Sequence, residues 1–106
     1  MTTAAQTLAE FAVGLKFDGI PSAVIERAKD CVIDTAGVCT YGSTLAWSRI
    51  VIGYAERYGK GGRSAIFGTP LKVQVPHAAL ANGALAHAFE MDSLVQPSVG
   101  VHPGAS

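Results

Sequence analysis

The chain has 106 residues, with 8 basic and 8 acidic side chains and no net charge, so it offers no basic field for nucleic acid or an anionic membrane surface. It is 49% hydrophobic and only 15% charged, against about 25% charged residues in typical domains. A small isolated domain normally carries more charge because so much of it is surface. The composition therefore predicts part of a domain, covered by further chain or by a partner.

The N-terminus lacks the basic and uninterrupted apolar segments of a signal peptide, and no apolar run approaches the roughly 20 residues of a membrane span. Cys31 and Cys39 are too few for a zinc pattern or a disulfide framework, and their placement on one predicted helix makes a bridge between them implausible. Both are predicted to be small buried hydrophobic residues in a reduced, cytoplasmic protein.

The first predicted helix is capped by Thr2 or Thr3 and reaches about Leu15, because its apolar residues recur on one face. A connector follows at residues 17–21, where glycine and proline interrupt the helical pattern.

A second helix is predicted from about Ser22 to Thr40. Its apolar and small residues are expected to form a buried stripe: Val24, Ala28, Cys31, Val32, Thr35, Ala36 and Cys39. Gly37 costs about 1 kcal/mol relative to alanine inside a helix, but with Ala36 it makes a smooth surface that another helix could approach closely. Gly42 is the expected helix stop.

A third helix is predicted over residues 47–58, closed by Gly59. Two short extended segments follow, at residues 64–67 and 72–75, with a turn between them, so a small β-hairpin is expected here. The large aromatic residues of the third helix are expected in a core or an interface: Trp47, Tyr54 and Tyr58.

Pro76 opens a fourth helix that reaches about Phe89. Asn82-Gly83 would signal a hairpin between alternating strands. Alanine and leucine flank this pair at helical spacing, so it is interpreted as a close-packing point in mid-helix. After a loop, residues 102–106 resemble the start of a fifth helix.

Proton-transfer groups gather in the last third of the chain. Residues 73–106 contain three His, one Glu and one Asp, but no Lys or Arg. This is the composition of half an active site, and any cation for an anionic substrate must come from elsewhere.

Two stretches of the sequence resemble signatures of the MmgE/PrpD family. The first is residues 20–37 followed by Tyr41-Gly42, and the second is residues 78–92 followed by His102-Pro103-Gly104. The family includes 2-methylcitrate dehydratase, cis-aconitate decarboxylase and iminodisuccinate epimerase. Its members have a large all-helical domain and a smaller α+β lid domain. The resemblance implies an all-α fold in which residues 1–106 form the first part of the helical domain, with the lid domain absent.

The family's acidic motif usually reads His-x-x-Asp-x-Asp-Asp-Thr, followed by His-Pro. Here His87-Ala-Phe-Glu90-Met-Asp92 is followed by Ser93-Leu94 and then by His102-Pro103. By resemblance, Glu90, Asp92 and His102 are the predicted catalytic residues. The first acid is one methylene longer than in the family, and Ser93 and Leu94 replace an acid and a threonine. These departures would reshape a pocket built for a particular polycarboxylate.

The resemblance implies a cofactor-independent lyase that moves or removes a group beside a carboxylate, here a dehydratase acting on a 2-methylcitrate-like polycarboxylate. Histidine can donate or accept a proton near neutral pH, and a nearby carboxylate can orient it or act as a second acid/base group. His102 would stand at a helix N-terminus, where free N–H groups favour a substrate carboxylate. The parent protein is expected to be a homodimer that binds neither nucleic acid nor membrane, and the isolated 106-residue chain is expected to be inactive.

Several alternatives stay open. The parent could be a decarboxylase or an epimerase similar to the other family members, or the chain could be a non-catalytic, truncated helical interaction module. Asn82 and His87 are candidates for substrate binding, although a structural role is favoured for each. His87 and Glu90 have the i, i+3 spacing of two metal ligands on one helix face, to which His102 could add a third. Because the family is not built around a protein-bound metal, no metal or cofactor is predicted.

Overall fold

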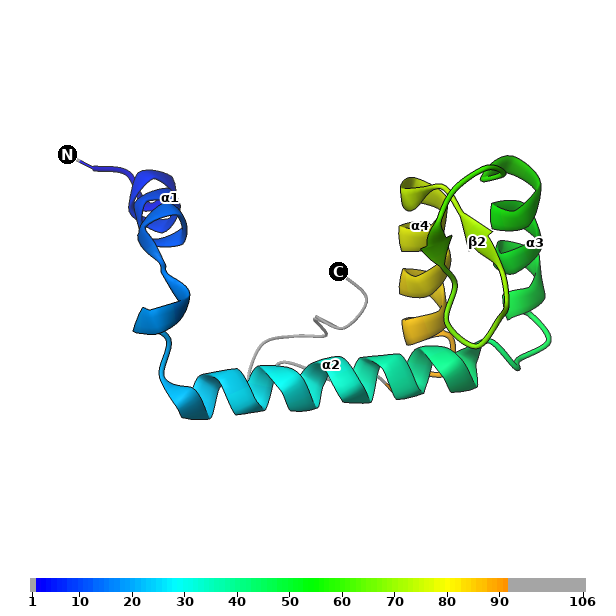
Figure 1. Cartoon of the computed structure of the whole chain (residues 1–106), viewed down its shortest axis with the longest axis horizontal. Helices are drawn as coiled ribbons and strands as arrows, with labels where there is room; N and C mark the ends of the chain where they lie inside the picture. Colours follow the sequence, from blue (N-terminus) through cyan, green and yellow to red (C-terminus); the bar gives the residue numbers. More distant parts are fainter. Residues whose placement is uncertain (1, 92–106) are drawn as a thin grey trace.

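The structure of the chain, a computed structural model, describes residues 2–91 and confirms the predicted fold class. Figure 1 shows a mostly helical chain with one small hairpin. In order, its elements are α1 (Ala4–Gly14), the short 3-10 helix η1 (Phe17–Gly19), α2 (Ser22–Gly42), α3 (Ser48–Tyr58), β1 (Ser64–Ala65), β2 (Lys72–Val73) and α4 (Val75–His87). None of the helices within 2–91 is long and apolar enough to cross a bilayer.

Helix α1 begins where the sequence predicts, because Thr3 forms a capping box with Gln6. The backbone N–H of Gln6 donates to Thr3 Oγ1 over 3.2 Å, and the N–H of Thr3 donates to Gln6 Oε1 over 2.8 Å. These reciprocal bonds satisfy two backbone donors that the helix itself leaves free. Yet no residue of α1 is buried, so its apolar face has no partner among the described residues.

Helix α2 is long, with α1 at its N-terminal end (Figure 1). At its C-terminal end it meets α3, the hairpin and α4, which together with this end of α2 form the compact part of the molecule. Only Val38, Cys39 and Gly42, near its C-terminus, are buried. The radius of gyration is 16.6 Å, against about 13 Å for a compact domain of roughly 100 residues. The chain is therefore extended along α2.

The predicted buried stripe of α2 is wrong over the first half of the helix. Val24, Cys31 and Val32 are exposed, because no other described element covers that half of the helix. Cys39, by contrast, is buried as predicted, with only 2% of its surface exposed. Cys31 is exposed and Cys39 is buried, so only one of the two cysteines is the buried hydrophobic residue that the sequence predicts.

The core lies where the C-terminal end of α2 meets α3, α4 and the hairpin. It consists of small and medium side chains drawn from all of these elements: Cys39, Ala55, Ile66, Val73, Ala78, Ala81, Leu85 and Ala86. The strands pair antiparallel, with Ser64 opposite Val73 and Ala65 opposite Lys72, which confirms the predicted hairpin. The aromatic residues Trp47, Tyr54 and Tyr58 are exposed and do not belong to this core, so of the two predicted positions only the interface stays a prediction.

Helices α2 and α4 cross in close contact at Gly42. A Cβ atom at this position would overlap the backbone carbonyl of Leu85, which is itself fully buried. At Gly37, where the sequence predicts a smooth surface for close approach, an added Cβ would meet no atom within 4 Å. Within residues 2–91, the close helix crossing therefore lies one and a half turns further along α2 than predicted.

Replacing the two glycines of α2 should have opposite effects on stability. Gly42→Ala is expected to lower the free energy of unfolding by about 2 kcal/mol, because the new methyl group forces α2 and α4 apart. Gly37→Ala should raise it by up to about 1 kcal/mol through helix propensity alone. Urea unfolding of the 106-residue chain, followed by circular dichroism, measures both values. Equal effects of the two substitutions would contradict this assignment of the crossing point.

Candidate functional site

Helix α4 carries Asn82 and His87, and the chain tightens where the helix ends before Glu90. The N–H of Ala88 donates to the carbonyl of Leu85 over 3.3 Å, and the N–H of Glu90 donates to the carbonyl of His87 over 3.2 Å. Both bonds span three residues rather than four, as is common where a helix closes. Pro76 lies in the first turn of the helix, as predicted.

Glu90 is held in an unusual backbone conformation just past this helix end. Its φ is +53°, a left-handed conformation that glycine or asparagine normally supplies after a helix. Its side chain is exposed. A non-glycine residue in this region costs about 1 kcal/mol or more, and such residues gather at functional sites. The structure thus presents the first predicted acid at the surface, at a position where a glutamate is not the conformationally favoured residue.

Two aromatic side chains hold the residues immediately before Glu90. The indole Nε1–H of Trp47 donates to the carbonyl oxygen of Ala88 over 3.1 Å. The ring of Phe89 meets the ring of Tyr41 edge-on, with 5.8 Å between the ring centroids. The end of α4 is therefore connected both to the start of α3 and to α2.

The side-chain amide of Asn82 is used within the fold. Its Oδ1 accepts the N–H of Phe67 over 3.0 Å, and its Nδ2 donates to the carbonyl of Ala65, also over 3.0 Å. The backbone carbonyl oxygen of Asn82 accepts a hydrogen bond from the Cys39 thiol over 3.4 Å. These bonds fix the orientation of the amide, because each end faces a group of only one kind. Asn82 joins α4 to the hairpin and to α2, which is the structural role that the sequence analysis favours.

Of the other predicted site residues, one lies within the described residues and two lie outside them. His87 lies exposed on the last turn of α4, three residues before Glu90. Asp92 and His102 lie outside the described residues, so their approach to Glu90 stays a prediction. Among residues 2–91 there is no group of three His, Cys, Asp or Glu side chains that could hold a metal ion.

Sequence reasoning missed the packing role of His77. Its ring lies 6.0 Å from the ring of Tyr54, centroid to centroid, and its Cβ fills the space where a side chain at Gly59 would stand. Its buried Nδ1 atom has no hydrogen-bond partner among the described groups. His77 fits the first turn of α4 against the end of α3. The only signal in the sequence was the neighbouring Pro76, which fixes that turn.

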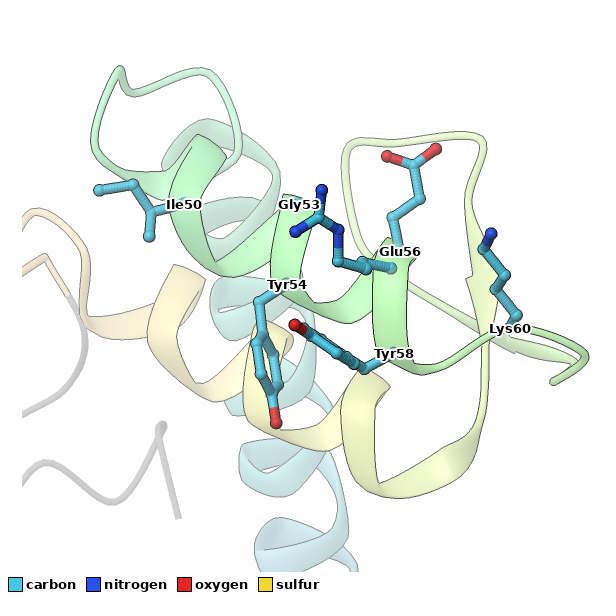
Figure 2. A pocket seen from close by; sticks show the side chains of 7 residues that line it. Ile50, Gly53, Tyr54, Glu56, Tyr58 and Lys60 are labelled. Carbon is cyan, nitrogen blue, oxygen red and sulfur yellow. The ribbon is translucent and has the colours of Figure 1, made fainter.

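Two hollows flank α3. The first has a volume of about 620 Å³ and is open to solvent; Figure 2 shows Tyr54 and Tyr58 beside each other in it, with ring centroids 5.0 Å apart. No residue of α4 lines it, so it is separate from the candidate residues. The second, of about 530 Å³, lies between α3 and α4, is mostly apolar, and reaches from Tyr54 to Trp47 and Ala88. This apolar groove therefore ends two residues before Glu90.

Comparison of the sequence with known protein families identifies the family of this chain. The model of the MmgE/PrpD N-terminal domain matches residues 6–106. The chain belongs to the MmgE/PrpD family. The matched range covers α4 and all of the predicted site residues, so the MmgE/PrpD resemblance seen in the two signatures is confirmed.

Two curated relatives of this MmgE/PrpD chain are cis-aconitate decarboxylases. The human protein is 29% identical to it over 94 residues and the mouse protein 27% identical over 94 residues; each alignment covers 88% of this chain. The chain spans only 19% of the length of either relative. No solved structure gave a significant match.

Substitutions at Asn82 should show how much its side-chain amide stabilises the contact between α4 and the hairpin. Asn82→Ala is expected to lower the free energy of unfolding by about 2 kcal/mol, because the hairpin loses two hydrogen bonds to α4. In Asn82→Asp a protonated carboxyl group can still donate to the Ala65 carbonyl, whereas a carboxylate is repelled by it. Folding therefore raises the pKa of the new acid, and its stability should be greatest below about pH 4 and fall as the pH rises.

Urea unfolding of both variants at several pH values tests this. Asn82→Ala serves as the control, since its stability relative to the unsubstituted chain should not vary with pH. An Asn82→Asp variant that gains stability as the pH rises would contradict the described orientation of the amide.

The left-handed conformation of Glu90 predicts a difference between two replacements. Asn adopts this conformation more readily than Ala, so Glu90→Asn should be more stable than Glu90→Ala by about 1 kcal/mol. Both variants remove the glutamate side chain, which makes the comparison specific for the backbone. Differential scanning calorimetry gives the difference, and equal melting temperatures would argue against the left-handed backbone at this residue.

Proposed function

We propose that this chain is the N-terminal part of a lyase that acts on a small polycarboxylate by acid/base chemistry, without a cofactor. The observation that carries the proposal is the family match over residues 6–106. The presentation of Glu90 supports it, because the carboxylate stands exposed past the end of α4 on a conformationally costly backbone.

The proposed chemistry requires a group that transfers a proton at carbon. In a dehydration, a base removes a proton from the carbon beside a carboxylate, and an acid protonates the hydroxyl group that leaves as water. In a decarboxylation, the carbon–carbon bond to the departing carboxylate breaks, and the electron pair left on the substrate is neutralised by a proton from an acid. Glu90 and His102 are the proposed proton-transfer residues, and Asp92 is proposed to orient His102 or to act as a second acid.

Decarboxylation of a cis-aconitate-like substrate is our first candidate reaction, because the human and mouse relatives both carry that name. Dehydration of a 2-methylcitrate-like substrate is the second, supported by the two family signatures in the sequence. Both substrates present several carboxylates. Since residues 73–106 contain no Lys or Arg, the cations that bind those carboxylates must lie elsewhere in the protein or in a second subunit of a homodimer.

The exposed apolar surface supports the view that this segment functions within a larger helical domain. Phe17, Val24 and Val32 line an apolar groove of about 650 Å³ along η1 and the first half of α2. A monomer of this size does not normally leave such a surface in water. We therefore expect the 106-residue chain alone to show no turnover.

Assays of the full-length protein against cis-aconitate and 2-methylcitrate test the proposal. Glu90→Gln keeps the size of the side chain but removes its proton-transfer capacity, and we expect kcat to fall at least about a hundredfold. His102→Ala should have a loss of similar size. Glu10→Gln is the matched control, because Glu10 is an exposed glutamate on α1, and it should keep wild-type kcat.

Release of CO2 identifies a decarboxylase, and an unsaturated product with no release of CO2 identifies a dehydratase. Wild-type turnover in Glu90→Gln would remove Glu90 from the mechanism. Absence of both reactions across a broad polycarboxylate panel would overturn the proposed lyase function.

A further inference from the structure

We propose that Trp47 is a positioning residue, whose indole N–H fixes the end of α4 and thereby the place of the Glu90 carboxylate. The inference deepens the proposed function, since it rests on Glu90 acting in proton transfer. It is carried by one hydrogen bond between residues far apart in the sequence, from Trp47 Nε1–H to the carbonyl oxygen of Ala88 over 3.1 Å.

Trp47 is itself firmly placed at the start of α3. Its backbone is helical, with φ −73° and ψ −26°, and its carbonyl accepts the N–H of Ile50 over 3.2 Å. The next residue, Ser48, is buried with only 3% of its surface exposed. The backbone of Trp47 is therefore held as the N-cap of α3, while its side chain reaches across to α4. The indole thus connects the start of α3 to the end of α4.

The acceptor of this bond is a group that α4 cannot satisfy by itself. The last four carbonyls of a helix have no partner within the helix and need an outside donor. At Ala88 that donor is the Trp47 indole. A tryptophan N–H can only donate, so the direction of the bond is fixed.

The position of Ala88 makes this bond matter for Glu90. Phe89 follows, with its ring against Tyr41 of α2, and then the chain turns at the positive φ of Glu90. A rotation at Ala88 would swing the Glu90 side chain through a large arc. Because about 1 Å of misplacement can cost an enzyme roughly a hundredfold in rate, a bond that prevents this rotation contributes to catalysis without touching the substrate.

The exposure of Trp47 argues against a role limited to filling the core. The residue is 54% exposed, so it removes much less apolar surface from water than a core tryptophan would. The polar contact with Ala88 is the specific feature of its environment. Removing the N–H should therefore affect the end of α4 much more than the overall stability.

The test uses full-length protein with two replacements at position 47. Trp47→Phe keeps an aromatic ring and loses the N–H, while incorporation of benzothienylalanine keeps the size of the indole and replaces only the N–H by sulfur. For both we expect kcat to fall about tenfold with KM changed less than about twofold, and an unchanged melting temperature. Amide hydrogen exchange should become faster at residues 88–91 and stay unchanged in the first turns of α4.

Tyr58→Phe is the matched control, because Tyr58 is an exposed aromatic residue of the same helix and lines the hollow that α4 does not reach. It should behave as wild type in turnover and in exchange. Wild-type kcat in either position-47 variant, beside an inactive Glu90→Gln, would overturn the positioning role and leave the proposed function intact. A loss of kcat accompanied by lower melting temperature and faster exchange throughout the chain would reduce Trp47 to a structural residue and would also overturn it.

If Glu90→Gln is fully active, the proposed role of Glu90 fails. Hydrogen exchange then tests separately whether the bond from Trp47 to Ala88 holds the end of α4. Unchanged exchange at residues 88–91 in both position-47 variants would show that Trp47 does not hold the end of α4.

Discussion

The close crossing of α2 and α4 is the contact on which the rest of this structure depends. At Gly42 the two backbones approach so closely that no side chain fits between them, and the Cys39 thiol, one turn earlier, donates to the Asn82 carbonyl. From the same residue of α4, the Asn82 amide reaches the hairpin. Helix α2 and the hairpin thus both meet α4 within a few residues of its middle. Glu90, the first of the predicted acids, lies just past the end of that helix.

The first half of the chain differs from the compact part in how little of it is buried. Helix α1, which has a capping box at Thr3, and the first half of α2 are both helical, yet they bury no side chains among the described residues. Isolated helices of this length are only marginally stable in water, since most helix stability in proteins comes from packing of an apolar face. This agrees with the low charge content of the sequence and with the small share, 19%, of the curated relatives that the chain spans.

The sequence predicted what depends on neighbouring residues and failed where distant residues meet. The cap at Thr3, the turn between the strands and the start of α4 near Pro76 are local, and all were predicted. Periodicity showed which residues of α2 share a face, but it carries no information on whether a partner covers that face, so Val24 and Val32 were wrongly placed in a core. The bond from Trp47 to Ala88 joins residues 41 positions apart, and no local pattern signals it. The left-handed φ of Glu90 was equally hidden, because a glutamate is not the residue from which such a conformation is inferred.

The small residues of α4 explain why directional bonds are needed to place Glu90. Ala78, Ala81 and Ala86 are buried against other elements, and such short side chains allow close approach. They also interlock weakly, because an alanine offers few atoms to resist rotation or sliding of the helix. A hydrogen bond, by contrast, weakens steeply when its angle changes. Asn82 in the middle of α4 and Trp47 at its end supply bonds of this kind on two sides. An alanine-rich helix can thus pack closely and still hold the Glu90 carboxylate in one direction, provided that polar contacts fix its rotation.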